Sequence, residues 1–210
     1  MFHAIARAVA FFLFKIFYRP KILGKENLPK DGGFILVSNH LGKVDVFAIA
    51  SLFKRKIYFM AKKEWFNKKS KAKLFKWMGA IPVDRDNVDI NSIKTCFATL
   101  KNGNALVIFP EGTRNRDCEV PLLPIKGGAS LIAFKSKVKI VPVFMHKKYK
   151  MFKRNYICIG EPYDYSNYQG QKLTPELSDA LSQEMADKLL ECKEKVDEFA
   201  KKKGKKWKLF

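Results

Sequence analysis

The chain has 210 residues, of which 47% are hydrophobic, and a formal net charge of +21. This length makes one domain the default, and the hydrophobic content excludes a disordered chain. The four cysteines form no CxxC pair and have no histidine nearby, so the sequence predicts neither a metal site nor a disulfide framework. No glycine-rich nucleotide loop is present, and we expect no bound cofactor. The large positive charge requires a polyanionic partner, either nucleic acid or an anionic membrane face.

Apolar runs with helical and strand periods alternate along the chain. We predict helices over residues 1–18, 43–53, 64–77, 89–101, 127–136 and 174–203, and strands over 20–24, 33–38, 57–61, 80–83, 104–109, 139–145 and 155–160. The alternation predicts a single α/β domain whose mostly parallel sheet is flanked by helices, with the site at the carboxyl ends of the strands. We assign 1–19 to an N-terminal helix, 20–173 to the α/β domain and 174–210 to a C-terminal helix and polybasic tail.

The first predicted helix has the pattern of a membrane-surface helix. Its apolar run, residues 4–18, is shorter than the about 20 residues that span a bilayer, and it carries Arg7 and Lys15. Around the helix these charges share one arc with His3 and Arg19, opposite a face of aliphatic and aromatic residues. We predict an amphipathic helix that lies in the membrane interface. A short spanning anchor and a helix packed on the domain remain alternatives, whereas a signal peptide is disfavoured because no small-residue cleavage site follows.

Two further segments mix lysine with aromatic residues. Residues 62–77 hold seven lysines among tryptophan, phenylalanine and leucine, and residues 201–210 form a polybasic tail. Near an anionic leaflet each such lysine contributes about 1 kcal/mol of binding free energy. We expect these segments and the N-terminal helix to form one membrane-facing side, at the cytoplasmic face of the cell membrane, although a solvated tail is the plainer interpretation. No specific nucleic-acid module is recognisable.

The segment NHLGKVD (39–45) carries a candidate general base. A buried strand is predicted to end at Asn39, so His40 stands where α/β sheets place their chemistry. On a regular helix the side chains of His40 and Asp45 would point roughly 140° apart. They can meet only if His40 lies in a loop bent at Gly42 and Asp45 lies in the first helical turn. Asp45 would then accept a hydrogen bond from one imidazole nitrogen and leave the other as a base.

No serine or cysteine is marked out as a nucleophile beside this histidine. We therefore infer that His40 activates a hydroxyl of the substrate, which is direct transfer without a covalent enzyme intermediate.

Two arginines follow strands that end at the same sheet edge. FPEGTR (109–114) comes after a buried strand, and its proline and Gly112 predict a tight turn that leaves Thr113 and Arg114 at this edge. Arginine offers a planar fork of donors that matches phosphate oxygens. Glu111 could hold Arg114 or a substrate hydroxyl.

Arg85 ends another short strand and is a second candidate for a phosphate ligand. Because Asp84 and Asp86 flank it, a structural ion pair with these aspartates is an equally good interpretation.

Four blocks now stand in order: NHLGKVD, GAIPVDR (79–85), FPEGTR and IKGGASLIAFKSKVKIVPV (125–143). Together they resemble the signature of the glycerolipid acyltransferase family, which includes the lysophosphatidic acid acyltransferases, and the resemblance extends from about Tyr18 to Pro162. It implies the same α/β architecture, His40 and Asp45 as the catalytic pair, and arginines that bind the phosphate of the acceptor.

The resemblance also extends to a lysine that opens an AKxEL segment in the family. Here the segment reads AKKEW, so Lys62 is the match and Trp65 replaces the usual leucine. The proline and glycine that commonly follow are missing from residues 66–77. The resemblance therefore does not predict the shape of the acyl-chain channel.

The activity implied is acyl transfer from a thioester donor, acyl-CoA or acyl-[acyl carrier protein], to the free hydroxyl of lysophosphatidic acid, giving phosphatidic acid. The residues expected to bind substrate are Lys62, Arg85, Glu111, Gly112, Thr113 and Arg114. Two alternatives remain: another acceptor, such as glycerol 3-phosphate or a different lysophospholipid, and a non-catalytic basic protein that binds membranes or nucleic acid.

Overall fold

The computed structural model describes residues 12–53, 56–84 and 89–205. Arg85, the first 11 residues of the predicted N-terminal helix, and the tail from residue 206 lie outside this part. The strands are β1 (Pro20–Leu23), β2 (Phe34–Ser38), β3 (Ile57–Lys62), β4 (Ala80–Val83), β5 (Ala105–Ile108), β6 (Lys139–Met145) and β7 (Asn155–Ile159). The helices are α2 (Asp45–Ala50), α3 (Lys69–Trp77), α4 (Ile90–Lys101), α5 (Gly127–Ser136) and α6 (Pro175–Lys205).

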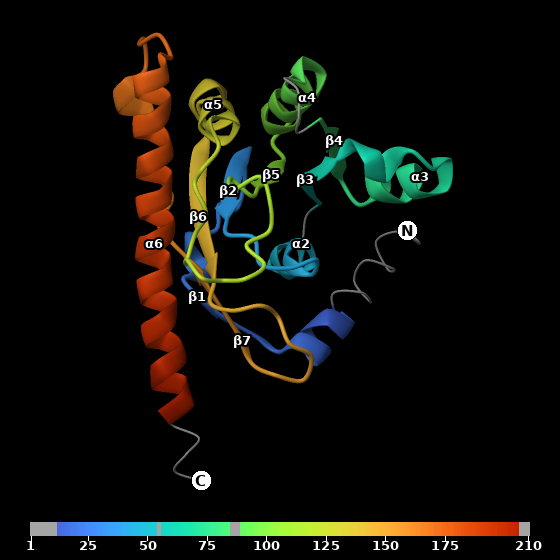
Figure 1. Cartoon of the computed structure of the whole chain (residues 1–210), viewed down its shortest axis with the longest axis vertical. Coiled ribbons are helices and arrows are strands. Elements are labelled where there is room, and N and C mark those ends of the chain that lie inside the picture. The colour runs from blue at the N-terminus through green and yellow to red at the C-terminus, as the bar shows by residue number, and fades with distance from the viewer. Residues whose placement is uncertain (1–11, 54–55, 85–88, 206–210) are drawn as a thin grey trace.

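The strands form one seven-stranded sheet in the order β1-β7-β6-β2-β5-β3-β4 (Figure 1). The five strands from β6 to β4 in this order are parallel, as the alternation of strands and helices predicted. β7 pairs with β6 antiparallel and with β1 parallel, so the two strands at this edge run against the other five. β2 and β5 are neighbours, so the segments that follow them, NHLGKVD and FPEGTR, leave the sheet side by side.

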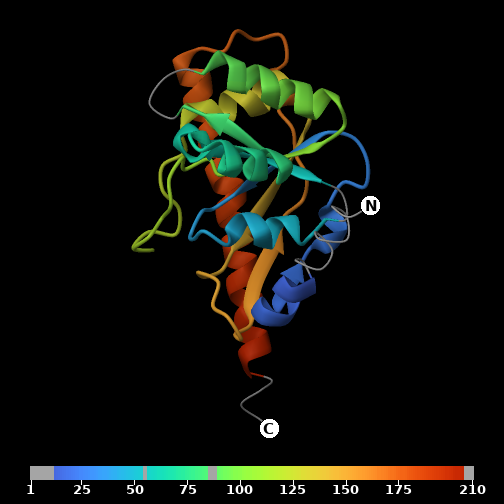
Figure 2. The ribbon, with the colours of Figure 1, turned by 90° about the vertical axis from the view of Figure 1, so that its right-hand side faces the viewer.

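Helices cover both faces of the sheet (Figures 1 and 2). One face packs against α4, α5 and α6, and the other against α2 and the helical residues 12–18. All five residues of β2 are buried because the strand is covered on both sides.

The prediction of one continuous helix over residues 64–77 is wrong. Residues Lys63–Phe66 form a 3-10 turn, and α3 begins only at Lys69. The backbone of Lys68 is extended, with φ −94° and ψ 123°, and no side chain caps the helix there. Asn67, a residue of capping type, instead ends the 3-10 turn, where its backbone is in the αR region and its N–H donates to the carbonyl of Glu64. α2 is likewise shorter than the expected 43–53.

α6 starts where the sequence predicted. The backbone N–H of Leu177 donates to Thr174 Oγ1 at 3.3 Å, so Thr174 caps the start of the helix. The stripe along α6 that packs on the sheet is buried at Leu181, Met185, Leu189, Cys192 and Val196.

α6 and α3 lie on opposite sides of the molecule (Figure 1), so the expectation that all basic segments share one side is not met for lysines 201–203.

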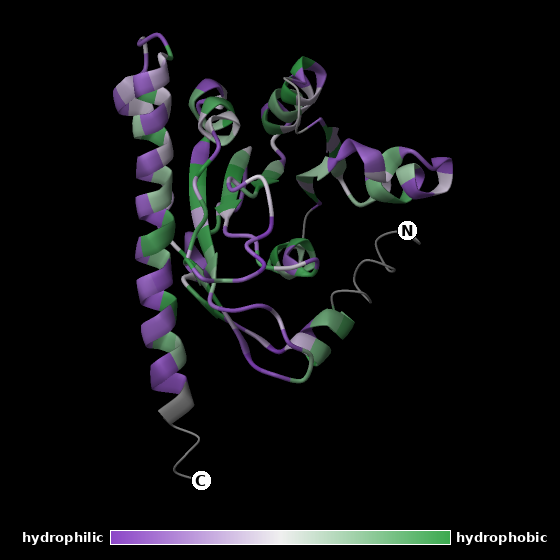
Figure 3. Ribbon diagram, viewed as in Figure 1, coloured by the Kyte–Doolittle hydropathy of each residue, from purple (hydrophilic) through white to green (hydrophobic). Residues whose placement is uncertain are grey.

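The described end of the N-terminal helix is partly packed and partly open. Phe14 is buried against the domain, whereas Phe12, Leu13 and Ile16 are 64%, 44% and 48% exposed. In Figure 3 this short helix is mostly green, the colour of hydrophobic residues. Within the described ranges, no helix is both long enough and apolar enough to span a bilayer.

Candidate active site

The site begins at the carboxyl end of β2. The amide of Asn39 forms two hydrogen bonds with the backbone of Met145, donating from Nδ2 to the carbonyl at 3.0 Å and accepting at Oδ1 from the N–H at 2.8 Å. This pair ties the chain just after β2 to the end of β6. His40 is the next residue and therefore leaves the sheet from a fixed point.

Asp45, the first residue of α2, holds the loop that carries His40. Its Oδ2 accepts from His40 Nδ1 at 2.8 Å and from the backbone N–H groups of Leu41 and Gly42 at 2.6 and 2.7 Å. The carboxylate is fully buried. Nδ1 faces a carboxylate and so carries the imidazole proton, while the lone pair of Nε2 meets no hydrogen-bond donor among the described residues. The geometry expected for His40 and Asp45 is thus present.

Phe109 fixes the imidazole from one side. The two rings stack with centroids 4.1 Å apart and an interplanar angle of 22°. The ring of His40 is therefore held in its plane by Asp45 and over its face by Phe109. This restricts the direction in which Nε2 can point.

Glu111 binds the backbone of His40, a role that the sequence did not indicate. Its Oε1 accepts from the N–H of His40 at 2.7 Å, and its Oε2 accepts from the N–H of Leu123 at 2.9 Å. Burial raises the pKa of Glu111 above its usual range, although these two bonds oppose the shift. The N–H of Asn115 donates to the carbonyl of His40 at 2.7 Å. The loop after β5 therefore holds His40 through both of its backbone groups.

Gly112 makes the turn that brings Glu111 and Asn115 to the backbone of His40. Its φ of 66° is in the left-handed region, and a Cβ at this position would lie 2.7 Å from Cδ of Lys126. Lys126 belongs to the fourth sequence block, but the resemblance assigned it no role.

Thr113 is exposed and Arg114 half-buried. The guanidinium of Arg114 forms no ion pair with any residue in the described ranges. In the sequence Arg114 lies between Glu111 and Asn115, the two residues that bind the backbone of His40.

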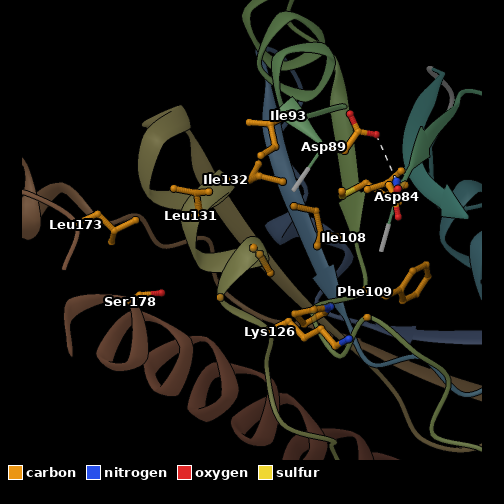
Figure 4. Close-up of a pocket in the computed structure, with 17 residues that line it drawn as sticks. Asp84, Asp89, Ile93, Ile108, Phe109, Lys126, Leu131, Ile132, Leu173 and Ser178 are labelled. Atoms are coloured by element: carbon orange, nitrogen blue, oxygen red, sulfur yellow. Dashed lines mark hydrogen bonds between the residues drawn. The ribbon is translucent and has the colours of Figure 1, made fainter. Parts of the chain in front are cut away.

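A cavity of about 580 Å³ opens beside Phe109, between the carboxyl ends of the strands and helices α4 and α5 (Figure 4). Its wall is mostly apolar, and Figure 4 shows Ile93, Ile108 and Ile132 around it. Lys126 and Asp84 are among its few charged residues. Phe109 lines this cavity and also stacks on His40, so the cavity and the imidazole share this ring as a neighbour.

Lys62 lies at the end of β3, two residues after Met60, which lines the cavity. Side chains two residues apart on a strand point to the same face, so Lys62 is on the cavity side of the sheet. Its ammonium is 3.0 Å from the carboxylate of Glu64. Within the described chain, the ion pair of Lys62 is thus with Glu64.

The neighbouring residue Lys63 bonds Asp84 at 2.5 Å. One of the two aspartates proposed as a structural partner of Arg85 is thus bound to a lysine, while Arg85 itself lies outside the described residues.

A second His–Asp pair exists that the sequence did not indicate, because its members are 51 residues apart. His146 Nδ1 lies 2.7 Å from Asp197 Oδ1, and the pair joins the chain at the end of β6 to α6. Asp197 also binds Lys193 at 2.8 Å. This pair lies outside the four sequence blocks, so it supplies a matched control for His40 and Asp45.

Comparison with known proteins identifies the family of this chain. The family model described as "Acyltransferase" matches residues 19–146. The chain is 35% identical over 191 residues to the 1-acyl-sn-glycerol-3-phosphate acyltransferase of Bacillus subtilis, covering 85% of this chain and 90% of that protein. It is 30% identical to the enzyme of the same name from Saccharomyces cerevisiae, covering 81% and 60% of the two chains.

The fold has a counterpart among solved structures. The crystal structure of the 1-acyl-sn-glycerophosphate acyltransferase PlsC from Thermotoga maritima matches with a TM-score of 0.61 and 24% identity, covering 92% of this chain and 81% of that one. With the family match over residues 19–146 and the Bacillus relative along nearly its whole length, the chain belongs to the acyltransferase family.

Proposed function

We propose that this acyltransferase moves an acyl group from a thioester donor to the free hydroxyl of lysophosphatidic acid, giving phosphatidic acid. The observation that carries the proposal is the His40–Asp45 pair, in which Nδ1 of the imidazole faces the carboxylate and the ring stacks on Phe109 of the apolar cavity. The names of the relatives from Bacillus subtilis and Saccharomyces cerevisiae support the choice of acceptor.

The reaction follows from the orientation of the imidazole. The acceptor hydroxyl donates to Nε2 of His40, which takes its proton as the oxygen attacks the thioester carbonyl. The new C–O bond forms, the C–S bond breaks, and the leaving thiolate takes the proton back from the imidazolium. Asp45 stabilises the imidazolium while it exists, and no bond between acyl group and enzyme is formed.

The apolar cavity is the proposed place of an acyl chain. Its wall is formed mostly by aliphatic and aromatic side chains, and burial of each methylene there stabilises binding by about 0.8 kcal/mol. A chain in this cavity would end beside Phe109, and so next to His40.

Arg114 and Arg85 are the proposed ligands of the acceptor phosphate, and Lys62 is a further proposed substrate-binding cation. Arg114→Ala is expected to lower kcat/KM for a phosphorylated acceptor by about 10- to 150-fold, because a charge-assisted hydrogen bond contributes roughly 1.5–3 kcal/mol. Hydrolysis of the acyl donor by water should change little. The measurement is acyl transfer and donor hydrolysis in the same samples. Arg116→Ala, at an exposed arginine two residues away, is the control, and equal loss of both reactions in Arg114→Ala would contradict the assignment.

We further propose that the enzyme works at an anionic membrane, at its cytoplasmic face. Support comes from the exposed apolar residues Phe12, Leu13 and Ile16, and from lysine-rich α3, where Leu74 and Trp77 are also exposed.

Replacing Phe12, Leu13 and Ile16 together with serine is expected to release most of the protein from anionic vesicles. The substitutions leave the buried Phe14 in place, so the core is preserved. Binding of the unaltered protein should weaken with salt but not vanish, because salt screens the lysines and not the apolar contribution. Vesicle sedimentation over a salt series measures this, with Ile90→Ser, at an exposed isoleucine on α4, as control. Unchanged vesicle binding by the triple variant, or tight and selective binding of one nucleic-acid sequence, would contradict the proposal.

The activity itself is tested with the purified protein and a panel of acceptors. Lysophosphatidic acid, glycerol 3-phosphate and other lysophospholipids are each combined with acyl-CoA or acyl-[acyl carrier protein], and the products are read by lipid mass spectrometry. Phosphatidic acid as the dominant product supports the proposal. A preference for another acceptor would replace lysophosphatidic acid but retain acyl transfer.

A further inference from the structure

Two buried side-chain oxygen atoms in or near the active site have no hydrogen-bond partner within the described chain. They are Oδ1 of Asp45 and the hydroxyl of Tyr149. Oδ2 of the same aspartate accepts three hydrogen bonds, so the carboxylate is held through one oxygen only. A buried carboxylate oxygen without a donor is costly, and native structures rarely leave one in that state.

Tyr149 and Asp45 share one region of the core. Tyr149 is 9% exposed and belongs to the same cluster as Leu41, whose N–H donates to Asp45. Burial, with the charge of Asp45 as a second cause, raises the pKa of the Tyr149 hydroxyl above its usual range. The hydroxyl therefore keeps its proton and can act as a donor.

The connection from β6 to β7 carries Tyr149 and is fastened to the N-terminal helix. The N–H of Phe152 donates to the carbonyl of Phe17 at 2.6 Å, and the two rings meet edge to face. The ring of Tyr149 contacts Phe14 and Tyr18, with centroids 5.8 and 5.9 Å away. The position of Tyr149 thus depends on the helix at residues 12–18.

We propose that Tyr149 is a positioning residue, whose hydroxyl supplies the missing donor to Oδ1 of Asp45, directly after a small side-chain rotation or through one bridging water. The carboxylate is then held from both oxygens, and its alignment with the imidazole of His40 is fixed. Because Phe14 and Tyr18 seat the ring of Tyr149, the N-terminal helix contributes to this alignment. The inference rests on the proposed role of His40 as general base.

Tyr149→Phe removes only the hydroxyl and tests the proposal. We expect kcat to fall about tenfold, the loss of one hydrogen bond to a charged group, with KM for donor and acceptor unchanged. Tyr163→Phe is the matched control, because the Tyr163 hydroxyl is also buried and unpartnered within the described chain but lies in the core on the other face of the sheet. The control should keep kcat within about twofold.

A spectroscopic readout separates this inference from the proposed function. The proton on Nδ1 of His40 is observable by NMR without substrate, and the Nδ1 proton of His146, bonded to Asp197, serves as internal reference. Tyr149→Phe should move the His40 resonance and leave the His146 resonance in place. An unmoved His40 resonance with normal kcat would overturn the inference. Normal turnover by His40→Ala would instead overturn the role of the base.

The contribution of the helix is tested by a double-mutant cycle. Phe14→Leu as a single substitution should lower kcat. Added to Tyr149→Phe it should have little further effect, because both changes act on the alignment of Asp45 by Tyr149. Fully additive losses would show that the helix does not act through Tyr149.

Discussion

Replacing His40 with alanine is expected to lower kcat by about 10²–10⁴-fold, the range in which a general base contributes to catalysis. The physical reason is that Nε2 is the nitrogen of the imidazole not held by Asp45, so its removal leaves the acceptor hydroxyl without a base. Thermal unfolding should change little, because the backbone of His40 remains bonded to Glu111 and Asn115. Product formation measured by mass spectrometry, together with an unfolding curve and vesicle binding, checks each part of this result.

The second His–Asp pair provides a close control for this variant. His146 is paired with Asp197 at almost the same distance as His40 with Asp45, but its ring neighbour is Tyr156 and not Phe109. His146→Ala should therefore retain turnover. A His40→Ala enzyme with a near-normal rate would overturn the mechanism, as would equal losses in the two variants.

Asp45→Asn is expected to be nearly as severe, again with a loss of about 10²–10⁴-fold in kcat. The amide oxygen of asparagine can still accept from the N–H groups of Leu41 and Gly42, so the loop and the start of α2 are preserved. What disappears is the negative charge that selects the tautomer of the neutral imidazole and stabilises the imidazolium formed during the reaction. Steady-state kinetics give kcat and KM, and the fall should appear in kcat.

The matching control is Asp197→Asn, which removes the charge beside His146. It should leave kcat within about twofold, since surface and peripheral substitutions rarely change more. Near-normal kcat in Asp45→Asn, with the fold intact, would contradict the assignment of Asp45.

The sequence was sufficient to predict the parts of the site whose contacts are local. His40 and Asp45 are five residues apart, and the end of a buried strand, a bend and a helix start are all visible in the pattern of residues between them. The alternation of strands and helices likewise predicted a mostly parallel sheet, because such an order requires crossover connections.

Contacts between distant residues could not be read in this way. Glu111 binds His40 across 71 residues, and the sequence alone allowed two other roles for its carboxylate. The reversed direction of β1 and β7 is also a matter of strand pairing, which periodicity does not encode.

The surroundings of the pair were decided by tertiary packing. Phe109 comes to lie on the imidazole because β5 is the neighbour of β2, and the ring of Tyr149 is packed against Phe14 of the N-terminal helix, 135 residues earlier in the chain. The sequence alone determined the two groups that carry the proposed chemistry, through short-range turn and helix geometry. Only the tertiary structure determined which side chains hold them, because those contacts depend on which strands pair and which helices cover each face.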